Sequence, residues 1–357
     1  MITKKVLVRP SDIKPSFKDW KILGAFNPGA VRYKDGKIVL YVRVAEKGIR
    51  MHGKAMHCPI IISGKEYKMG YVKIDMPKVL KKGRNVVYLK EGICRLMHIS
   101  HFRKVVLSKD GFNVEEVDDK PSFTGRPPHE NYGVEDPRIT KIGSKYLMTY
   151  VSVSDNEGIS TSLAVSKDLK RWQRKGIIFR ETNKDVVLFP EKIKGKYAAL
   201  HRPQGFYVFS RPSIWISYSP DLIYWGREKS IIRPRENSWE SDKIGAGAPP
   251  IKTDKGWLLI YHGAVKKNKK RSYYAGAALL DLKDPEKIIA RTPANKPLIE
   301  PSESYEKKGF VDNVVFPTGA VPDIDKENLL IYSGGADRVV SVKKISFKKI
   351  FKNMKYF

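Results

Sequence analysis

Five segments of this chain repeat one pattern, and internal repetition of this kind strongly limits the folds available to it. Each segment has a proline, a short run of alternating apolar residues, a polar turn and a second apolar run. They read FNPGAVRYKDGKIVLYVRVAE from residue 26, VEDPRITKIGSKYLMTYVSVS from 134, LFPEKIKGKYAALHRP from 188, GAPPIKTDKGWLLIYHGA from 247 and VFPTGAVPDIDKENLLIYSGGAD from 315. The turns DGK, GSK, KGK and DKG supply the glycine that tight two-strand connections favour. The pattern therefore predicts five β-hairpins.

Further pairs of strand-like runs lie between the hairpins, such as SLAVSKDLKRWQRKG and SIWISYSPDLIYWGR. Each repeat then supplies about four short antiparallel strands, which is the blade unit of a β-propeller. We therefore expect an all-β fold, a five-bladed β-propeller with four-stranded antiparallel blades and its site at the axial mouth. No linker rich in Gly, Ser or Pro divides the chain, so residues 1–357 should form one domain. Residues from about 51 to 92 look like an insertion in the first blade region.

The hairpin topology predicts which residues meet at the mouth. The innermost strand of a blade starts, and its antiparallel partner ends, at the same end of the propeller axis. Five such pairs should converge there: Asn27 with Arg43, Asp136 with Ser152, Glu191 with Arg202, Pro249 with His262, and Thr318 with Asp337. A mouth of this kind would be concave, polar and mixed in charge, which makes it the expected ligand site.

An acidic pair, Glu135 and Asp136, opens the second hairpin. Successive side chains of a strand point to opposite faces, so one of the two should face the mouth and the other should pack into the blade. We take Asp136 as the candidate acid and Glu135 as the packed residue. The structural alternative is that Asp136 caps a turn or pairs with Arg138, and the residues alone leave both roles open.

Basic residues close the third and fourth hairpins. LHRP contains Arg202 and YHGA contains His262, and Lys184 lies just before the third inner strand. A guanidinium matches phosphate oxygens bidentately, so an anion site is credible where these hairpins end. Each residue also has a structural interpretation, because lysine is common throughout this chain and a single histidine is more often hydrogen-bonded within a fold. Likewise Tyr273, Tyr274 and Trp239 could stack on a sugar ring, but packing between blades is favoured.

Composition narrows the partners. The chain carries 68 basic and 38 acidic residues, a net charge of +30, with the lysines spread along its whole length. No nucleic-acid motif accompanies them, so a solvated basic surface is favoured over a nucleic-acid partner, and the positive field would favour a small anion such as phosphate. No apolar run approaches the roughly 20 residues of a membrane span, and no signal peptide is evident, so we expect a cytoplasmic protein without a membrane partner. Cys58 and Cys94 lie in no metal-spacing motif, and no metal is expected.

The repeated motifs together resemble glycoside hydrolase family 130, the mannoside phosphorylases and mannosidases built on a five-bladed propeller. The matching stretches are FNPGAV, GVEDPR, NKDVVLFPEKIKGKYAALHRP, GAGAPPI, LLIYHGA, GAALLDLKDP and VFPTGAV with YSGGAD, from residue 26 to residue 337. The insertion is the part of the chain that does not match.

The resemblance implies roles at the matching positions. The aspartate of the family's E-D-P-R motif is its general acid, which is Asp136 here. The family's phosphate-binding residues correspond to Arg202, His262, Tyr273 and Lys184. The residues that line its sugar subsites correspond to Asn27, Arg43, Asp185, Asn313 and Asp337.

The implied reaction is inverting phosphorolysis of β-mannosides to α-mannose 1-phosphate and a shortened sugar, a glycosyltransferase-type reaction. An inverting glycosidase needs an acid and a nucleophile on the opposite face; phosphate is already an anion and needs a basic clamp instead of a second carboxylate. In the family the acid is thought to act through the 3-hydroxyl of the bound mannose. The resemblance favours β-1,2-mannobiose or β-1,2-oligomannan as substrate. The alternatives are phosphorolysis of β-1,4-mannooligosaccharides or mannosylglucose, hydrolysis by a β-mannosidase, and non-catalytic glycan binding.

The expected partners follow from this reaction. They are a β-mannooligosaccharide and inorganic phosphate as co-substrate, with no other cofactor, and a homo-oligomer is possible. Hydrolytic members resemble the phosphorylases but lack the phosphate-binding set and use glutamates instead. This chain keeps the HRP and YHG motifs, so phosphorolysis is favoured over hydrolysis.

Overall fold

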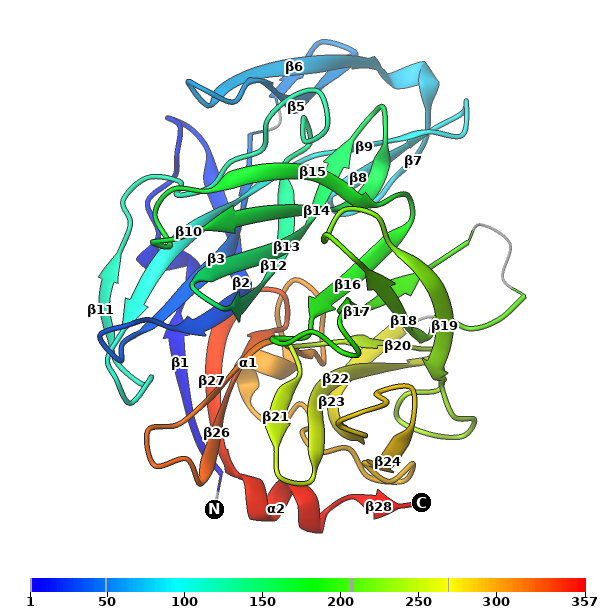
Figure 1. Ribbon diagram of the computed structural model, residues 1–357. Coiled ribbons are helices and arrows are strands. Elements are labelled where there is room, and N and C mark those ends of the chain that lie inside the picture. The colour runs from blue at the N-terminus through cyan, green and yellow to red at the C-terminus, as the bar shows by residue number, and fades with distance from the viewer. Residues whose placement is uncertain (1, 49, 206–208, 269) are drawn as a thin grey trace.

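The computed structural model describes residues 2–48, 50–205, 209–268 and 270–357. Within this part of the chain lie 28 β-strands, which confirms the all-β expectation (Figure 1). Helix is confined to α1 (Ser304–Lys307), α2 (Phe347–Lys352) and the 3-10 turns η1 (Pro10–Asp12) and η2 (Met76–Lys78) among the described residues. No helix of the described residues has the length and apolar character needed to cross a membrane.

Five antiparallel sheets of four or more strands make up most of the molecule. In spatial order, the first is β11 (Val114–Val117), β10 (Ile99–Leu107), β3 (Ile38–Lys47) and β2 (Lys21–Arg32). The second is β12 (Val134–Ile142), β13 (Lys145–Ser154), β14 (Gly158–Ser166) and β15 (Gln173–Phe179). The third is β16 (Asn183–Leu188), β17 (Tyr197–Pro203), β18 (Ile214–Ser219) and β19 (Gly226–Ile232).

The fourth and fifth sheets are built from strands of the C-terminal half of the chain, together with the N-terminal strand β1. The fourth contains β20 (Lys243–Ala246), β22 (Gly256–Lys267), β23 (Lys270–Leu280), β24 (Ile288–Arg291) and β28 (Lys355–Tyr356), with β21 (Ile251–Thr253) also paired to β22. The fifth is β1 (Thr3–Val8), β27 (Val339–Ser346), β26 (Asn328–Gly335) and β25 (Val315–Pro322). The N-terminal strand β1 therefore completes a sheet whose other strands come from the C-terminal part of the sequence.

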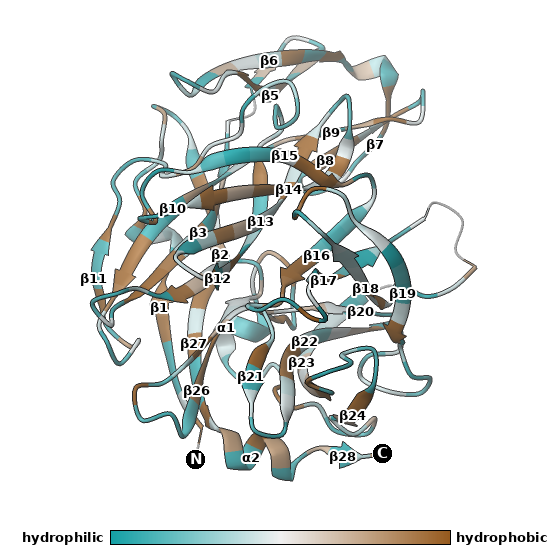
Figure 2. Cartoon of the chain, viewed as in Figure 1, coloured by the Kyte–Doolittle hydropathy of each residue, from teal (hydrophilic) through white to brown (hydrophobic). Residues whose placement is uncertain are grey.

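The apolar core lies between neighbouring sheets. Separate clusters of buried side chains join the first sheet to the second, the second to the third, the third to the fourth, the fourth to the fifth, and the fifth back to the first. Strand β13 shows how the sequence produces this: Leu147 packs toward the third sheet, and the next residue, Met148, packs toward the first. Alternate side chains of one strand point to opposite faces, so a strand such as β13, buried at every position after Lys145, can serve two interfaces. Figure 2 also shows a difference between two strands of this sheet: hydrophobic residues cover more of β14 than of β15, most of which is hydrophilic.

The expected insertion forms two small sheets between β3 and β10. One consists of β4 (Arg50–His52), β5 (Ala55–Ser63) and β6 (Lys68–Asp75), and the other of β7 (Val79–Lys82), β8 (Val86–Leu89) and β9 (Cys94–Leu96). They share a small core in which Met56 and Cys58 of one sheet pack with Val87 and Leu89 of the other. Figure 1 places β5 and β6 at the end of the molecule opposite the two termini.

Two of the predicted hairpins begin earlier than the sequence pattern indicated. The third opens with β16, and Lys184 rather than Glu191 pairs with Arg202. The fourth opens with β20, and Gly245 rather than Pro249 pairs with His262. The reason is that Pro137 lies at a bulge inside its strand, whereas Pro190 and Pro249 follow the ends of theirs. An alignment of the repeats on their prolines therefore predicts a start for each of these two hairpins that is too late in the sequence.

Candidate active site

In each of the first three sheets, the first strand in the sequence carries an Asn or Asp residue whose backbone lies in the left-handed region. The φ values are +47° at Asn27, +49° at Asp136 and +58° at Asp185. Each lies where the register of its hairpin shifts, in β2, β12 and β16 respectively. Asn and Asp tolerate this conformation better than other non-glycine residues, and a bulge re-aims the side chain that it carries. The three bulges thus supply the side chains from which the candidate site is built.

The bulge at Asp136 overturns the expectation that Glu135 packs away from the site. Nη2 of Arg43 lies 2.6 Å from Oε1 of Glu135, and Nη1 lies 3.0 Å from Oδ1 of Asp136. Both carboxylates therefore contact one guanidinium. Strict alternation along a strand fails here because the register shifts between Glu135 and Arg138.

Asn27, Arg43, Glu135 and Asp136 form what we call the acid cluster. Nδ2 of Asn27 donates a hydrogen bond to Oδ1 of Asp136 over 2.9 Å. Burial alone would lower the pKa of Arg43, but Glu135 and Asp136 raise it. Burial alone would raise the pKa of Glu135, but Arg43 and Lys184 lower it to about 2. The structure thus brings together Asn27, Arg43 and Asp136, as predicted, and adds Glu135.

Asp337 faces the acid cluster from the turn after β26. Burial raises its pKa to about 6, with Arg43 opposing the shift and the charges of Asp136 and Glu135 adding to it. A carboxyl group with such a pKa carries a proton for part of the time near neutral pH, so it can donate as well as accept hydrogen bonds.

A second group of side chains surrounds Asp185. Its carboxylate accepts from Nη2 of Arg138 at 3.0 Å and from Nε of Arg202 at 2.6 Å. Nε2 of His262 lies 3.5 Å from Oδ2 of the same carboxylate. Burial would raise the pKa of Asp185, but the guanidinium groups of Arg202 and Arg138 hold it well below its usual range. Asp185 therefore remains charged and holds the predicted phosphate-binding residues Arg202 and His262 together.

His262 is neutral and fully buried. Burial lowers its pKa to about 3 against the opposing effect of Asp185. Neither ring nitrogen has a hydrogen-bond partner among the described residues. A Cβ at Gly245, on the paired strand, would collide with both Asp185 and His262, so glycine is required for this close approach. An unpartnered buried imidazole is costly in a fold and calls for an explanation.

Tyr273 and Lys243 extend this side of the site. The ring of Tyr273 lies 6.2 Å from that of His262, and Nζ of Lys243 lies 5.3 Å from the Tyr273 ring centroid. Burial raises the pKa of Tyr273 to about 12 and lowers that of Lys243 to about 7, the latter with help from Arg202 and Arg271. We call Lys184, Arg202, Lys243, His262 and Tyr273 the basic cluster. Lys184 joins it to the acid cluster, because its Nζ lies 3.4 Å from Oε2 of Glu135.

Asn313 is connected to the site through the backbone. Its carbonyl accepts a hydrogen bond from the amide of Tyr273 over 2.9 Å, and its φ is +57°. Its side chain is exposed, so its predicted contact with sugar stays a prediction. Glu191 lies outside the site: it is exposed and pairs with Lys252 over 2.6 Å.

Sequence reasoning missed Lys243 for an identifiable reason. The repeat pattern predicts that the fourth hairpin starts at Gly247, whereas its first strand, β20, begins four residues earlier with Lys243. A hairpin that starts with β20 instead places Lys243 two residues before Gly245, the partner of His262. Glu135 was missed because a bulge is not visible in the alternation pattern.

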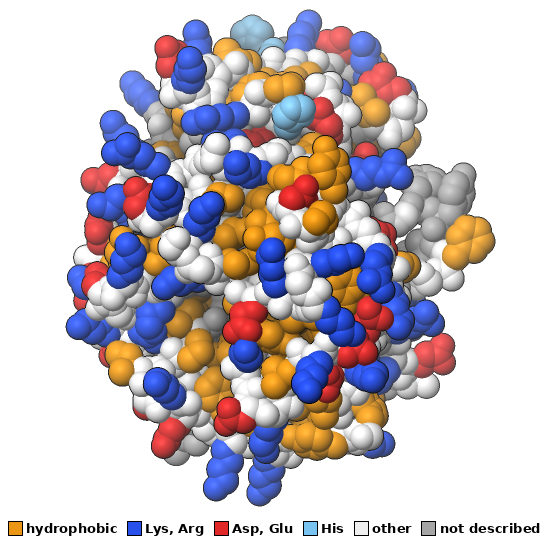
Figure 3. All heavy atoms as spheres, viewed as in Figure 1, with side chains coloured by type: hydrophobic (Ala, Val, Ile, Leu, Met, Phe, Trp, Pro, Cys, Tyr) orange, Lys and Arg blue, Asp and Glu red, His pale blue; other side chains and the backbone are white. Residues whose placement is uncertain are grey.

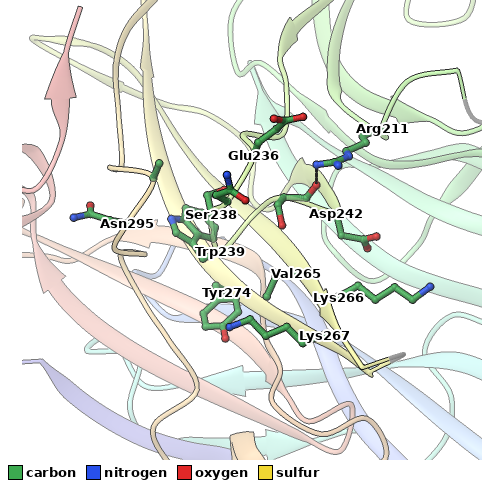
Figure 4. Close-up of a pocket in the computed structure, with 13 residues that line it drawn as sticks. Arg211, Glu236, Ser238, Trp239, Asp242, Val265, Lys266, Lys267, Tyr274 and Asn295 are labelled. Atoms are coloured by element: carbon green, nitrogen blue, oxygen red, sulfur yellow. Dashed lines mark hydrogen bonds between the residues drawn. The ribbon is translucent and has the colours of Figure 1, made fainter.

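One pocket of the structure is lined by residues that belong to neither cluster (Figure 4). It has a volume of about 930 Å³ and its lining includes Arg211, Asn237, Trp239, Asp242, Lys266 and Tyr274. Trp239 is 7 % exposed, and its indole N–H donates to the carbonyl of Pro293 over 3.0 Å. Its ring packs 5.7 Å from that of Tyr261, which favours the packing role for Trp239 over sugar stacking.

The surface charge is dispersed on the face drawn in Figure 3, where Lys and Arg alternate with acidic, polar and apolar side chains. Within the described residues, no group of three or more His, Cys, Asp and Glu side chains could hold a metal ion.

Comparison with known proteins identifies the family. Residues 97–356 match the model of glycoside hydrolase family 130, described as beta-1,4-mannooligosaccharide phosphorylase. The chain belongs to this family. The match begins after the insertion and leaves out residues 1–96, which include the FNPGAV motif.

Individual relatives are also similar over most of the chain. A beta-1,2-mannobiose phosphorylase of Listeria innocua serovar 6a is 37 % identical over 335 residues, which cover 93 % of this chain and 91 % of the relative. A 1,2-beta-oligomannan phosphorylase of Thermoanaerobacter sp. strain X514 is 45 % identical over 247 residues, covering 68 % of this chain and 78 % of the relative. The solved structure of the Listeria innocua beta-1,2-mannobiose phosphorylase in complex with beta-1,2-mannobiose aligns with a TM-score of 0.88 and 34 % identity, over 99 % of this chain and 98 % of that one.

Proposed function

We propose that this protein is an inverting phosphorylase that converts β-1,2-mannosides, mannobiose or short oligomannans, and inorganic phosphate into α-mannose 1-phosphate and a shortened sugar. The observation that carries the proposal is that Asp136, held by Arg43 in the acid cluster, lies beside a separate basic cluster, which Lys184 joins to the acid cluster through its contact with Glu135. The activities of the curated relatives at 37 % and 45 % identity support both phosphorolysis and the β-1,2 linkage.

In this proposal Asp136 is the general acid. Oδ1 is held by Asn27 and Arg43, and Oδ2 has no hydrogen bond within the described part of the chain. The carboxyl group can therefore present a proton on Oδ2 while Oδ1 fixes its orientation. As the family resemblance implies, the proton passes through the 3-hydroxyl of the bound mannose to the leaving oxygen. Asn27, Arg43, Asp185, Asn313 and Asp337 are the proposed sugar-side residues.

The basic cluster is the proposed phosphate site. Arg202 uses Nε on Asp185 and Nη1 on Oε1 of Gln204, at 2.6 and 3.0 Å, which leaves Nη2 to bind an anion. Lys184, Lys243, His262 and Tyr273 supply further positive charge or hydrogen-bond donors. Phosphate bound there is the nucleophile, so the site needs no base to activate it.

Hydrolysis is the alternative that the same site must be tested against. Glu135 is poorly suited as the base that water requires, because Arg43 and Lys184 occupy its oxygens and hold its pKa at about 2. Asp337, whose pKa is raised to about 6, is a better candidate for a base. The experiment below separates the two reactions.

We further propose that the five large sheets are the four-stranded blades of a five-bladed propeller forming one domain of residues 1–357, with the fourth blade extended. The cyclic order of the five apolar clusters supports this arrangement. Phosphate is the proposed co-substrate, without another cofactor. The exposed free thiol of Cys94 is consistent with action in the reducing cytoplasm.

The test incubates the protein with β-1,2-mannobiose and with β-1,4-mannobiose, each with and without phosphate, and follows mannose 1-phosphate and free mannose. Phosphate-dependent release of mannose 1-phosphate from the β-1,2 substrate is expected. Release of two mannose molecules that ignores phosphate would instead establish a β-mannosidase. Arg202→Ala should raise the KM for phosphate at least tenfold, as expected for loss of one charge-assisted contact, while Lys252→Ala, an exposed cation outside the site, should leave it unchanged.

A further inference from the structure

A side chain of the insertion contacts the segment that leads toward Asp337 of the candidate site. Arg84 lies in the turn between β7 and β8, and its Nη1 donates to the carbonyl of Phe310 and, at 3.4 Å, to that of Gly309. Its guanidinium also stacks on the ring of Phe310, 4.4 Å from the centroid. This contact joins a turn in the first half of the chain to a segment 226 residues later in the sequence.

One end of the β7–β9 sheet lies beside the acid cluster: Val86, two residues after Arg84, is paired with Leu96 there. On one side of this end, Leu96 of β9 packs with Val151 of the second sheet, and Val151 is paired with Glu135. Burial lowers the pKa of His98, which follows β9, to about 4, and the charges of Arg43 and Glu135 also act on it. On the other side, the amide of Phe310 donates to the carbonyl of Ala336, the residue before Asp337, over 2.8 Å. This end of the small sheet therefore reaches from the Glu135 side to the Asp337 side.

From this placement we propose that Arg84 is a specificity-determining residue that limits the length of the mannoside accepted by the site. This inference rests on the proposed phosphorylase function. The contact of Arg84 with Phe310 joins the insertion to the segment before β25. In this proposal a longer sugar chain that leaves Asp136 in this direction has to part the two, and the shorter mannobiose does not.

The contact between Arg84 and Phe310 can discriminate between short and long mannosides without blocking access to the site. Arg84 is exposed, so its cation–π and charge-assisted hydrogen bonds are weak enough to open. Opening them for each longer substrate lowers kcat/KM for that substrate relative to mannobiose. Removal of the contact should raise the ratio of kcat/KM for β-1,2-mannotetraose to that for β-1,2-mannobiose by about fivefold.

The experiment measures this ratio, with phosphate present, for the wild type and for Arg84→Ala, Phe310→Leu and the double variant. Phe310→Leu keeps apolar volume but removes the aromatic face, so it should raise the ratio by a smaller factor. In the double variant the two effects should not add, because Arg84 acts through Phe310. Arg95→Ala is the matched control: Arg95 lies on β9 of the same sheet, with its guanidinium 6.0 Å from the ring of Tyr132, and should leave the ratio unchanged.

The outcomes distinguish this inference from the function on which it rests. An active wild type whose ratio is the same in Arg84→Ala would overturn the role of Arg84 and leave the phosphorylase function intact. Equal increases in Arg84→Ala and Arg95→Ala would also overturn it, since general loosening of the sheet would then be the cause. A wild type that releases no mannose 1-phosphate from either substrate would overturn the proposed function and this inference together.

Discussion

Asn27 and Asp136 are 109 residues apart in the sequence, yet Nδ2 of the first donates to Oδ1 of the second over 2.9 Å. Both residues sit at bulges and both have left-handed φ values, +47° and +49°. The first strands of two neighbouring sheets are thus deformed in the same way, and the two deformations make their side chains meet. An amide donor at this distance fixes the carboxylate in one orientation, which a general acid requires.

Replacing Asp136 by Asn should lower kcat by at least about 100-fold, because the variant cannot donate the proton that the leaving oxygen needs. Asn tolerates the left-handed backbone and retains nearly the same volume, so the fold should persist. Initial rates of mannose 1-phosphate release and a thermal melt of the same sample measure the two quantities. Asp254→Asn, an exposed carboxylate in the turn between β21 and β22, is the control and should keep full activity. Activity within twofold of wild type in Asp136→Asn would remove Asp136 from the acid role.

The all-β fold and its hairpins could be predicted from the sequence because turn residues and alternating apolar runs are local signals. The residues DGK, GSK and DKG occur where β-hairpins turn. The convergence of Asn27, Arg43 and Asp136 followed from that topology. In contrast, the bulges depend on how each first strand packs against its neighbours, and no local signal marks Asp136 as left-handed. Glu135 was therefore assigned to the wrong face.

The position of the insertion in the chain could be predicted from the sequence, but its fold and its contacts could not. Its strands are short, and the position of Arg84 over Phe310 depends on a contact across 226 residues. The same applies to Lys243, whose significance depends on where β20 begins. The residues that control specificity are thus the ones least open to sequence reasoning, because loops and strand ends carry few repeated constraints.

Glu135→Gln should lower kcat/KM for the mannoside about tenfold and leave the dependence on phosphate intact. In the wild type Glu135 carries full charge at neutral pH, since its pKa is about 2, and it orients both Arg43 and Lys184. A neutral amide keeps the volume but weakens both charge-assisted contacts, each worth about 1.5–3 kcal/mol where buried. Steady-state kinetics with each substrate varied in turn provide the measurement. Complete loss of turnover, without loss of the fold, would instead indicate that Glu135 takes part in the chemistry.

The KM for phosphate should rise as the pH increases from 6 to 8.5. Lys243 has a pKa of about 7, because burial and the nearby cations Arg202 and Arg271 disfavour its charged form. It is a cation below this pH and becomes neutral above it, so attraction for phosphate is strongest on the acidic side. Lys243→Arg stays charged throughout the range and should flatten the profile. Lys243→Gln should show a high KM at every pH. A wild-type profile that Lys243→Arg reproduces would show that another group controls it.

Asp185 should make a large contribution to stability, with a defined dependence on pH. It is 2 % exposed, and Asp185→Asn would leave the buried cations Arg138 and Arg202 without their shared carboxylate. Loss of one partner from a buried ion pair lowers the free energy of unfolding by about 3–5 kcal/mol. The folded state lowers the pKa of Asp185 below its ordinary value of 3.8, so the stabilisation is complete above that pH and disappears as the pH falls through the folded-state pKa. Urea midpoints of the wild type and Asp185→Asn should therefore differ most near pH 7 and approach each other below about pH 4. Glu191→Gln removes the exposed partner of Lys252 and should produce only a small fraction of this change at any pH; midpoint shifts of equal size in the two variants would contradict the role assigned to Asp185.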